Sequence, residues 1–289
     1  MRFVATVLLW LLTTAALAVA VPTMWAQHTI VDRTGYSAFA ASAAKDPSVQ
    51  QAMAAALTNQ LVKLAANSGY DVNENLFNGA ATAYTRSSAF PGQFALANQI
   101  VHRWMFTEAV QQTDSSGRWQ LDLSPMLSDS SFKQTLQDFG IHPPSTLTIP
   151  LTENVSESLR PGQLRQATKW GPWVSVGSAI VAGVFALLTI AAAKERGKAI
   201  AALGVSALLV GAVGWAAIEV LRGRINQALD ATNDDIRQLA DALVGHAIGS
   251  LHQWLNLTLA AGAALVVLGV LAAMLGGLGR RRVVEPLSK

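Results

Sequence analysis

The most regular feature of this sequence is a set of four apolar runs, each about twenty residues long and free of charged side chains. A helix rises about 1.5 Å per residue, so a run of this length can cross a hydrocarbon core about 30 Å thick. The pattern therefore predicts a membrane protein with four spanning helices. The runs are Phe3–Met24, Trp173–Ala193, Ala199–Ile218 and Leu255–Leu278.

The polar stretch between the first and second runs is long enough to fold as a domain of its own. Apolar residues recur in it at helical spacing, and Asp46-Pro47 supplies the N-cap and first-turn proline that open a helix. Residues 118–123 alternate apolar and polar side chains and predict a short strand, and residues 146–151 predict a second. The expected helices cover residues 36–44, 47–66, 73–85, 91–111 and 125–139.

These patterns together predict the fold class. We expect a mainly α protein, in which a four-helix transmembrane region carries a mostly helical extracytoplasmic domain with a short two-stranded β element. The expected order is transmembrane helix 1 as a signal anchor (1–25), the extracytoplasmic domain (26–170), transmembrane helix 2 (171–194), a cytoplasmic loop (195–198), transmembrane helix 3 (199–220), an extracytoplasmic amphipathic helical hairpin (221–254), transmembrane helix 4 (255–278) and a cytoplasmic tail (279–289).

The hairpin segment between the third and fourth runs differs from the rest because its apolar residues alternate at spacings of four and three. This spacing predicts an apolar seam along a helix, which we expect to face the larger domain. The alternative is a helix lying in the lipid headgroups, but the three basic and five acidic residues of 219–254 disfavour it. The residues of the candidate interaction seam are Ile225, Leu229, Ile236, Leu239, Leu243 and Leu251.

The distribution of charge predicts the orientation in the membrane. Arg2, residues 194–198 and residues 279–289 together hold eight basic and two acidic residues, whereas residues 24–170 hold ten basic and eleven acidic ones. Short Lys/Arg-rich segments stay on the cytoplasmic side, so both termini should be cytoplasmic and the large domain exported across the plasma (inner) membrane. A cleaved signal peptide is the alternative for the first run, which is however longer than an ordinary signal core.

Candidate catalytic and metal-binding patterns are few. The chain has five histidines and no cysteine, and the histidines do not fall at the spacing of a known metal motif. The most suggestive polar pair is Asn98 and His102, four residues apart on one helical face. They could form a functional pair, but a buried hydrogen-bonded pair that fixes helix packing is the favoured interpretation. We expect no catalytic residue, no metal and no cofactor, and therefore no enzyme.

The interiors of the four runs lack Asp, Glu, Lys, Arg and His. Transport through a membrane generally needs ionisable groups that face a cavity, so the chain is not expected to transport anything by itself. The runs are instead rich in glycine, which lets helices approach closely. This composition predicts association among the spans or with another subunit.

The layout resembles a group of actinobacterial four-span envelope membrane proteins, similar to the LucB-type accessory subunits of the mycobacterial Mce lipid-import complex. The resemblance is carried by Asp46-Pro47-Ser48-Val49-Gln50, by Phe94 with Asn98 and His102, by Leu121-Asp122-Leu123-Ser124-Pro125, and by the paired spans around Lys194-Glu195-Arg196. It implies a protein partner in a lipid-transport complex and no catalysis by this chain.

Three functions are compatible with these patterns. The leading hypothesis is a non-catalytic accessory or scaffold subunit of a cell-envelope complex, in contact with membrane lipid and a protein partner, and without nucleic acid. The second is a membrane-anchored domain that binds a lipid or other apolar ligand. The third is a cell-envelope enzyme that uses His102 with Asp122 or with another acid distant in the sequence. The aromatic residues that would line a ligand cavity are Phe77, Phe94, Trp104, Phe106 and Trp119.

Overall fold

The computed structural model describes residues 2–67, 73–107, 120–122, 148–150, 162–229 and 234–281. The chain divides into two compact units, each described separately below. The membrane unit comprises residues 1–27, 170–223 and 248–289, and the polar unit comprises residues 28–169 and 224–247.

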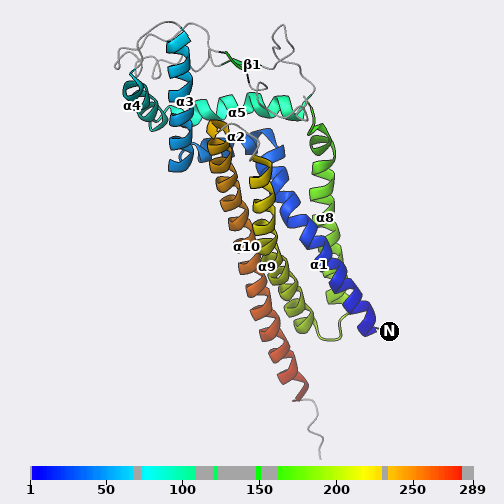
Figure 1. Ribbon diagram of the computed structural model, residues 1–289. Helices are drawn as coiled ribbons and strands as arrows, with labels where there is room; N and C mark the ends of the chain where they lie inside the picture. Colours follow the sequence, from blue (N-terminus) through cyan, green and yellow to red (C-terminus); the bar gives the residue numbers. More distant parts are fainter. Residues whose placement is uncertain are drawn as a thin grey trace, which may run out of the picture. The chain divides into compact units, whose positions relative to one another are not determined.

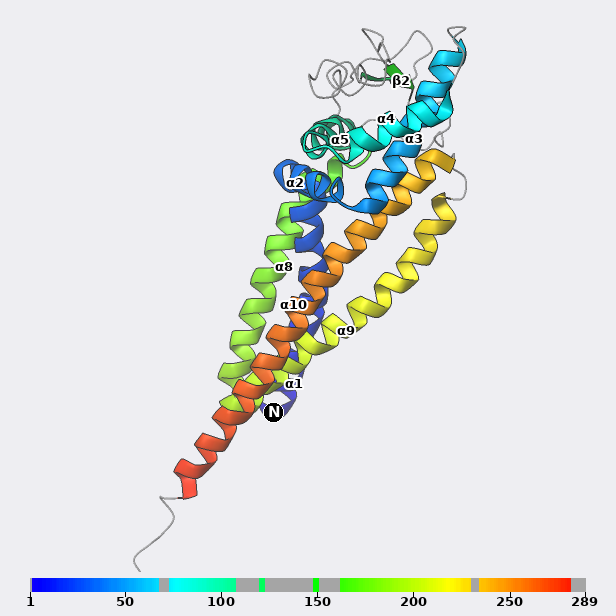
Figure 2. The same cartoon turned by 90° about the vertical axis from the view of Figure 1, so that its left-hand side faces the viewer.

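Four long helices run through the membrane unit (Figures 1 and 2). They are α1 (Arg2–Ala26), α8 (Arg165–Ala192), α9 (Arg196–Leu229) and α10 (Asp234–Arg281). Each contains a stretch long and apolar enough to cross a membrane, which confirms the four expected spans and makes this a multi-pass membrane protein. Both α9 and α10 extend well beyond the apolar runs, because α9 continues to Leu229 and α10 begins at Asp234.

Helices α9 and α10 are antiparallel and touch through glycines. A Cβ atom placed on Gly204 would lie 2.6 Å from the carbonyl oxygen of Gly262, and one on Gly211 would lie 2.6 Å from the side chain of Leu259. Gly197 and Gly269 also approach the backbone of the opposite helix too closely for a side chain. Backbones that lie this close gain van der Waals contact, which drives helix association in a bilayer.

Helix α1 is joined to α9 and α10 by hydrogen bonds. The Trp10 indole Nε1 donates to the carbonyl of Ala202 at 2.8 Å, and the Thr14 hydroxyl donates to the hydroxyl of Ser206 at 2.8 Å. Near the other end of α1, Trp25 Nε1 donates to the Ser250 hydroxyl of α10 at 3.2 Å. These bonds satisfy polar groups that would otherwise lie against hydrocarbon.

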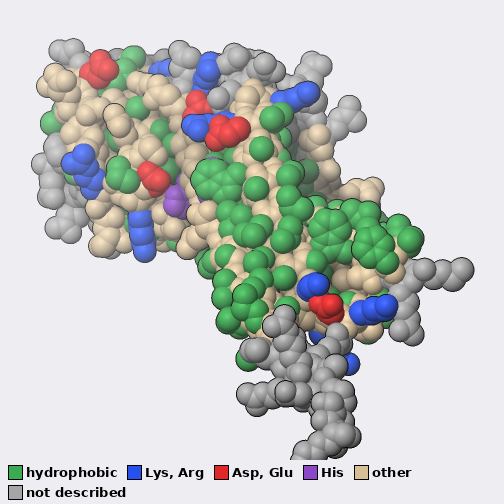
Figure 3. All heavy atoms as spheres, turned by 90° about the horizontal axis from the view of Figure 1, so that it is seen from below, with side chains coloured by type: hydrophobic (Ala, Val, Ile, Leu, Met, Phe, Trp, Pro, Cys, Tyr) green, Lys and Arg blue, Asp and Glu red, His purple; other side chains and the backbone are tan. Residues whose placement is uncertain are grey.

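The surface of the membrane unit is apolar on all four helices. Figure 3 shows hydrophobic side chains gathered on the spans as seen from below. The exposed apolar residues of the four helices include Leu8 of α1, Leu187 of α8, Val213 of α9 and Met274 of α10. Exposed apolar surface of this extent is unfavourable in water and is accommodated by lipid or by other membrane helices.

A short π-helix, η1 (Gln27–Val31), lies at the boundary between the units in the sequence, and the polar unit continues with α2 (Arg33–Ala43), α3 (Pro47–Asn67), α4 (Glu74–Thr85) and α5 (Phe90–Phe106). The helices predicted at 36–44, 47–66 and 73–85 are therefore confirmed, with small shifts at their ends. The helix predicted at 91–111 is confirmed at its start but ends earlier, at Phe106. The predicted helix at 125–139 lies outside the described residues. Helix α2 packs against α5, and α3 packs against α4.

The core of the polar unit is built largely from alanine and a few aromatic side chains. Tyr84, Phe90 and Val49 are fully buried at its centre, with Ala40, Ala43 and Ala44 around them. Small side chains on α2 allow close approach of the neighbouring helices, while the aromatic rings fill the remaining space. Phe90 meets Tyr84 edge to face at 5.5 Å and lies 5.4 Å from Phe94.

The expected fold class was wrong in its β component. The described part of the chain is 92% helical, with eight α-helices, and its β structure is limited to one pair of very short segments. Only three-residue segments pair where longer strands were expected, β1 (Gln120–Asp122) antiparallel to β2 (Thr148–Pro150), and the residues around them lie outside the described part. Since a lone two-stranded pair has too little apolar surface to be stable by itself, the described fold is all-α.

Candidate functional site

His102, one member of the predicted polar pair, is buried on α5. Its Nε2 atom lies 3.0 Å from the carbonyl oxygen of Ile30 and 3.2 Å from that of Val31, the last two residues of η1. Carbonyl oxygens at the end of a helix lack partners within it and accept bonds from elsewhere. Because a carbonyl can only accept, Nε2 must carry the proton, and His102 ties the end of η1 to α5.

Asn98, the second member of the pair, bonds to other residues than His102. Its Oδ1 accepts a hydrogen bond from the Tyr36 hydroxyl at 3.2 Å, and its Nδ2 donates to the carbonyl of Phe94 at 2.9 Å. Tyr36 thus links the two residues, because its ring also lies 4.7 Å from the imidazole of His102. The sequence pattern identified Asn98 and His102 but contained no signal for Tyr36, which comes from a different helix.

Burial changes the acid–base properties of this cluster. Desolvation lowers the pKa of His102, while the hydrogen bonds to the carbonyls of Ile30 and Val31 oppose that change. Desolvation likewise raises the pKa of Tyr36. The imidazole is stacked against Phe106 at 4.3 Å, so one ring face is covered by Phe106 and Tyr36 lies close by. A neutral imidazole held in this way suits helix packing better than proton transfer.

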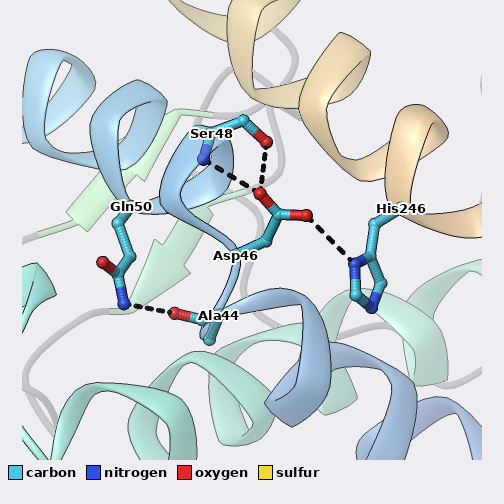
Figure 4. A network of polar contacts seen from close by, with 5 residues as sticks. All are labelled: Ala44, Asp46, Ser48, Gln50 and His246. Atoms are coloured by element: carbon cyan, nitrogen blue, oxygen red, sulfur yellow. Dashed lines mark hydrogen bonds and ion pairs between the residues drawn. The ribbon is translucent and has the colours of Figure 1, made fainter.

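A second polar network lies where α2 ends and α3 begins (Figure 4). Asp46 Oδ1 accepts hydrogen bonds from the backbone nitrogen of Ser48 at 3.0 Å and from the Ser48 hydroxyl at 2.7 Å. These bonds cap the first turn of α3, as the Asp46-Pro47 pattern predicts. They also lower the pKa of Asp46, with a smaller contribution from His246.

The other carboxylate oxygen of Asp46 faces α10. His246 Nδ1 lies 3.3 Å from Asp46 Oδ2, and the imidazole lies 5.5 Å from the ring of Phe39 on α2. The carboxylate therefore lies between Ser48 and His246. In a hydrolytic triad the imidazole must instead contact the serine hydroxyl to remove its proton, so this arrangement cannot activate Ser48 as a nucleophile.

The candidate seam reaches the core of the polar unit at two of its six residues. Leu239 and Leu243 on α10 pack against the core cluster, together with Ala242. Leu251 is half-buried in the membrane unit. The side chains of Ile225, Leu229 and Ile236 lie outside the described part of the structure.

The aromatic residues expected to line a ligand cavity lie between packed helices where the structure describes them. Phe94, Trp104 and Phe106 are buried, and Phe77 is half-buried. These aromatic side chains therefore serve as packing residues between helices. Trp119 and the side chain of Asp122 lie outside the described part, so the pairing of His102 with Asp122 is not tested. No group of three or more His, Cys, Asp and Glu side chains that could hold a metal occurs among the described residues.

One polar contact in the membrane unit had no signal in the sequence. His252 of α10 stacks on Trp215 of α9, with ring centroids 3.7 Å apart, and Trp215 Nε1 donates to Asn256 Oδ1 at 3.3 Å. His246 and His252, six residues apart on α10, thus contact different surroundings, as the helical spacing predicts.

The chain was compared with protein families, curated proteins and solved structures, and none of them matches it.

Proposed function

We propose that this chain is a non-catalytic accessory or scaffold subunit of a membrane complex in the cell envelope. In this role the spans and the polar unit provide surfaces on which partner proteins assemble. The complex that the sequence resemblance implies is one for lipid transport, and that assignment is part of the proposal.

The observation that carries the proposal is that the polar side chains capable of acid–base chemistry bind the protein's own backbone. His102 binds the terminal carbonyls of η1, and Asp46 caps α3. The described part of the chain uses these groups to hold helices together. Buried polar groups normally serve packing in this way, and this use supports a non-catalytic role.

The membrane unit supports the same role. Its α9–α10 pair is packed backbone to backbone through Gly204 and Gly262, which makes a rigid core for an assembly. Bulky apolar side chains such as Leu187 and Val213 remain on the outside, at 69% and 65% exposure. Such positions are available to lipid and to the helices of a partner subunit.

The proposal includes an orientation. The basic residues that flank the spans, including Lys194, Arg196 and Lys198 at the α8–α9 connection, favour a cytoplasmic location for that connection and for both termini. The polar unit would then face the extracytoplasmic side of the plasma membrane. Accessibility of single cysteines to an impermeant reagent tests this directly, because the natural chain has no cysteine.

The test of the accessory role is purification of the tagged full-length chain from its native membranes in mild detergent, with quantitative mass spectrometry. We expect membrane-protein partners in a fixed stoichiometric ratio to this chain. A photocrosslinking residue at Leu187 should then join the chain to one of those partners, whereas the same residue at the buried Ala182 should not.

Two results would contradict the proposal. One is recovery of the chain as a monomer at its natural abundance, with crosslinks from Leu187 only to lipid. The other is a catalytic activity of the purified chain that is abolished by His102→Gln while the protein remains folded.

A further inference from the structure

Asp46 divides its two carboxylate oxygens between two tasks. Oδ1 takes both hydrogen bonds from Ser48 and completes the cap of α3, whereas Oδ2 is left to the imidazole of His246. The first task is local, within two residues. The second connects positions 200 residues apart in the sequence. The two tasks are separable, because asparagine can cap a helix as well as aspartate but has no charge.

The His246 contact follows, along α10, two leucines that pack against the core of the polar unit. Leu239 and Leu243, one and two turns earlier on α10, pack against the core of the polar unit. Phe39 of α2 lies beside the imidazole and limits its position. The side chains of His246 and Asp46 are 23% and 33% exposed, so the pair is shielded in part and yet open to protons from solvent.

Asp46 is the charged side chain that the structure shows in contact with His246. Among the described side chains, α2 carries Arg33, the α2–α3 junction carries Lys45 and Asp46, and α3 carries Lys63. On α10, Asp241 lies 3.8 Å from Arg237 and is engaged with it. Asp46 is the acid that contacts the imidazole, and its carboxylate is ionised at neutral pH because Ser48 stabilises the charged form.

We propose that the contact between His246 and Asp46 is a pH-sensitive latch that holds the first turns of α10 against the α2–α3 junction of the polar unit. When His246 is protonated, the contact is an ion pair and the latch is closed. When His246 is neutral, the contact is reduced to a single hydrogen bond and the latch loosens.

The expected change is modest and local. A partly exposed ion pair shifts an equilibrium between closed and loosened forms by about two- to fivefold. Histidine is the side chain whose charge ordinarily changes between about pH 5 and 8, which sets the pH range over which the contact is to be tested. The apolar contacts of Leu239 and Leu243 remain in both forms and keep α10 folded.

The experiment is a distance measurement between two spin labels in the full-length chain reconstituted in nanodiscs. Labelled cysteines replace Gln51, exposed on α3, and Gly245, where an added Cβ meets no atom within 4 Å. We expect a narrow distance distribution near pH 5.5 and, near pH 8, a broader one whose loosened fraction is about two- to fivefold larger. An unchanged distribution over this range overturns the proposal.

Three variants make the result specific. Asp46→Asn keeps the cap of α3, and His246→Asn keeps a polar group near Asp46, and both should abolish the pH dependence. His252→Asn removes the other α10 histidine, which contacts Trp215, and should leave the pH dependence intact. If Asp46→Asn and His246→Asn respond to pH as the unmodified chain does, another group titrates and the latch is refuted.

Discussion

Gly204 of α9 and Gly262 of α10 face each other so closely that neither position has room for a side chain. A Cβ on Gly204 would lie 2.6 Å from the carbonyl oxygen of Gly262, and a Cβ on Gly262 would lie 2.8 Å from that of Gly204. The obstacle on each side is backbone, which cannot rotate away as a side chain can. The two helices must therefore move apart to accept any larger residue.

This relationship predicts that Gly204→Ala and Gly262→Ala each destabilise the membrane unit, by about 1–3 kcal/mol for an overpacked contact. Thermal unfolding in detergent, followed by tryptophan fluorescence, measures the change. Gly183→Ala on α8 is the matched control, because its added Cβ meets nothing within 4 Å. Equal effects of all three substitutions would contradict this account of the α9–α10 contact.

The cap of α3 leads to a second prediction. Asp46→Ala removes the acceptor for the Ser48 backbone nitrogen and should lower the stability of the polar unit by about 1 kcal/mol. Asp46→Asn retains an acceptor and should change stability at pH 8 by only a few tenths of a kcal/mol. Chemical denaturation followed by circular dichroism distinguishes the two, and equal losses would show that the charge, rather than the cap, is what matters.

A third prediction concerns acid sensitivity. Burial lowers the pKa of His102 in the folded chain, so below the ordinary histidine pKa of about 6.5 the unfolded chain binds a proton that the folded chain does not. The free energy of unfolding should therefore fall as the pH falls from about 6.5 toward the lowered pKa of the folded state, and recover as the pH rises. Melting temperatures at a series of pH values measure this slope.

His102→Gln tests the origin of that slope. The variant should be less stable than the unmodified chain at pH 8, by about 1–3 kcal/mol, because it loses the ring stacking on Phe106. Between about pH 6.5 and 5, however, it should lose less stability than the unmodified chain. The same slope in both proteins would assign the acid sensitivity to another group.

The attachment of α10 to the polar unit gives a fourth prediction. Leu243→Ala removes a half-buried side chain that packs against the core, and we expect a loss of about 1–2 kcal/mol, less than the value for a fully buried leucine. Leu257→Ala is the control on the same helix, because Leu257 is 65% exposed and should be close to neutral. Thermal unfolding in detergent compares them, and a loss at Leu257 as large as at Leu243 would contradict the assignment.

The helices of this protein were largely predictable because their signals are local. Charge-free runs identified all four spans, and Asp46-Pro47 marked the start of α3 to the residue. The face that each helix buries is not given by periodicity alone: on α4, Tyr84 is fully buried, whereas Leu76 is exposed and Phe77 is half-buried. Burial depends on the neighbouring helix, which periodicity alone does not identify.

The extent of the strands and the long-range polar contacts could not be predicted from the sequence, for different reasons. The alternation at residues 118–123 is too short to distinguish a strand from irregular chain, and an isolated pair of strands is marginal in any case. The contact between Asp46 and His246 joins residues 200 positions apart, and the link between Asn98 and His102 passes through Tyr36 on another helix. Neither relationship leaves a trace in local spacing.

The glycine contacts between α9 and α10 also constrain how this protein can change in length. Gly197, Gly204 and Gly211 recur every seven residues, as do Gly262 and Gly269. A seven-residue repeat matches 3.5 residues per turn, slightly fewer than in a straight helix, so the two helices must wind around each other left-handedly to stay in contact. One inserted residue would turn every later glycine by about 100° out of the contact, whereas seven would restore it.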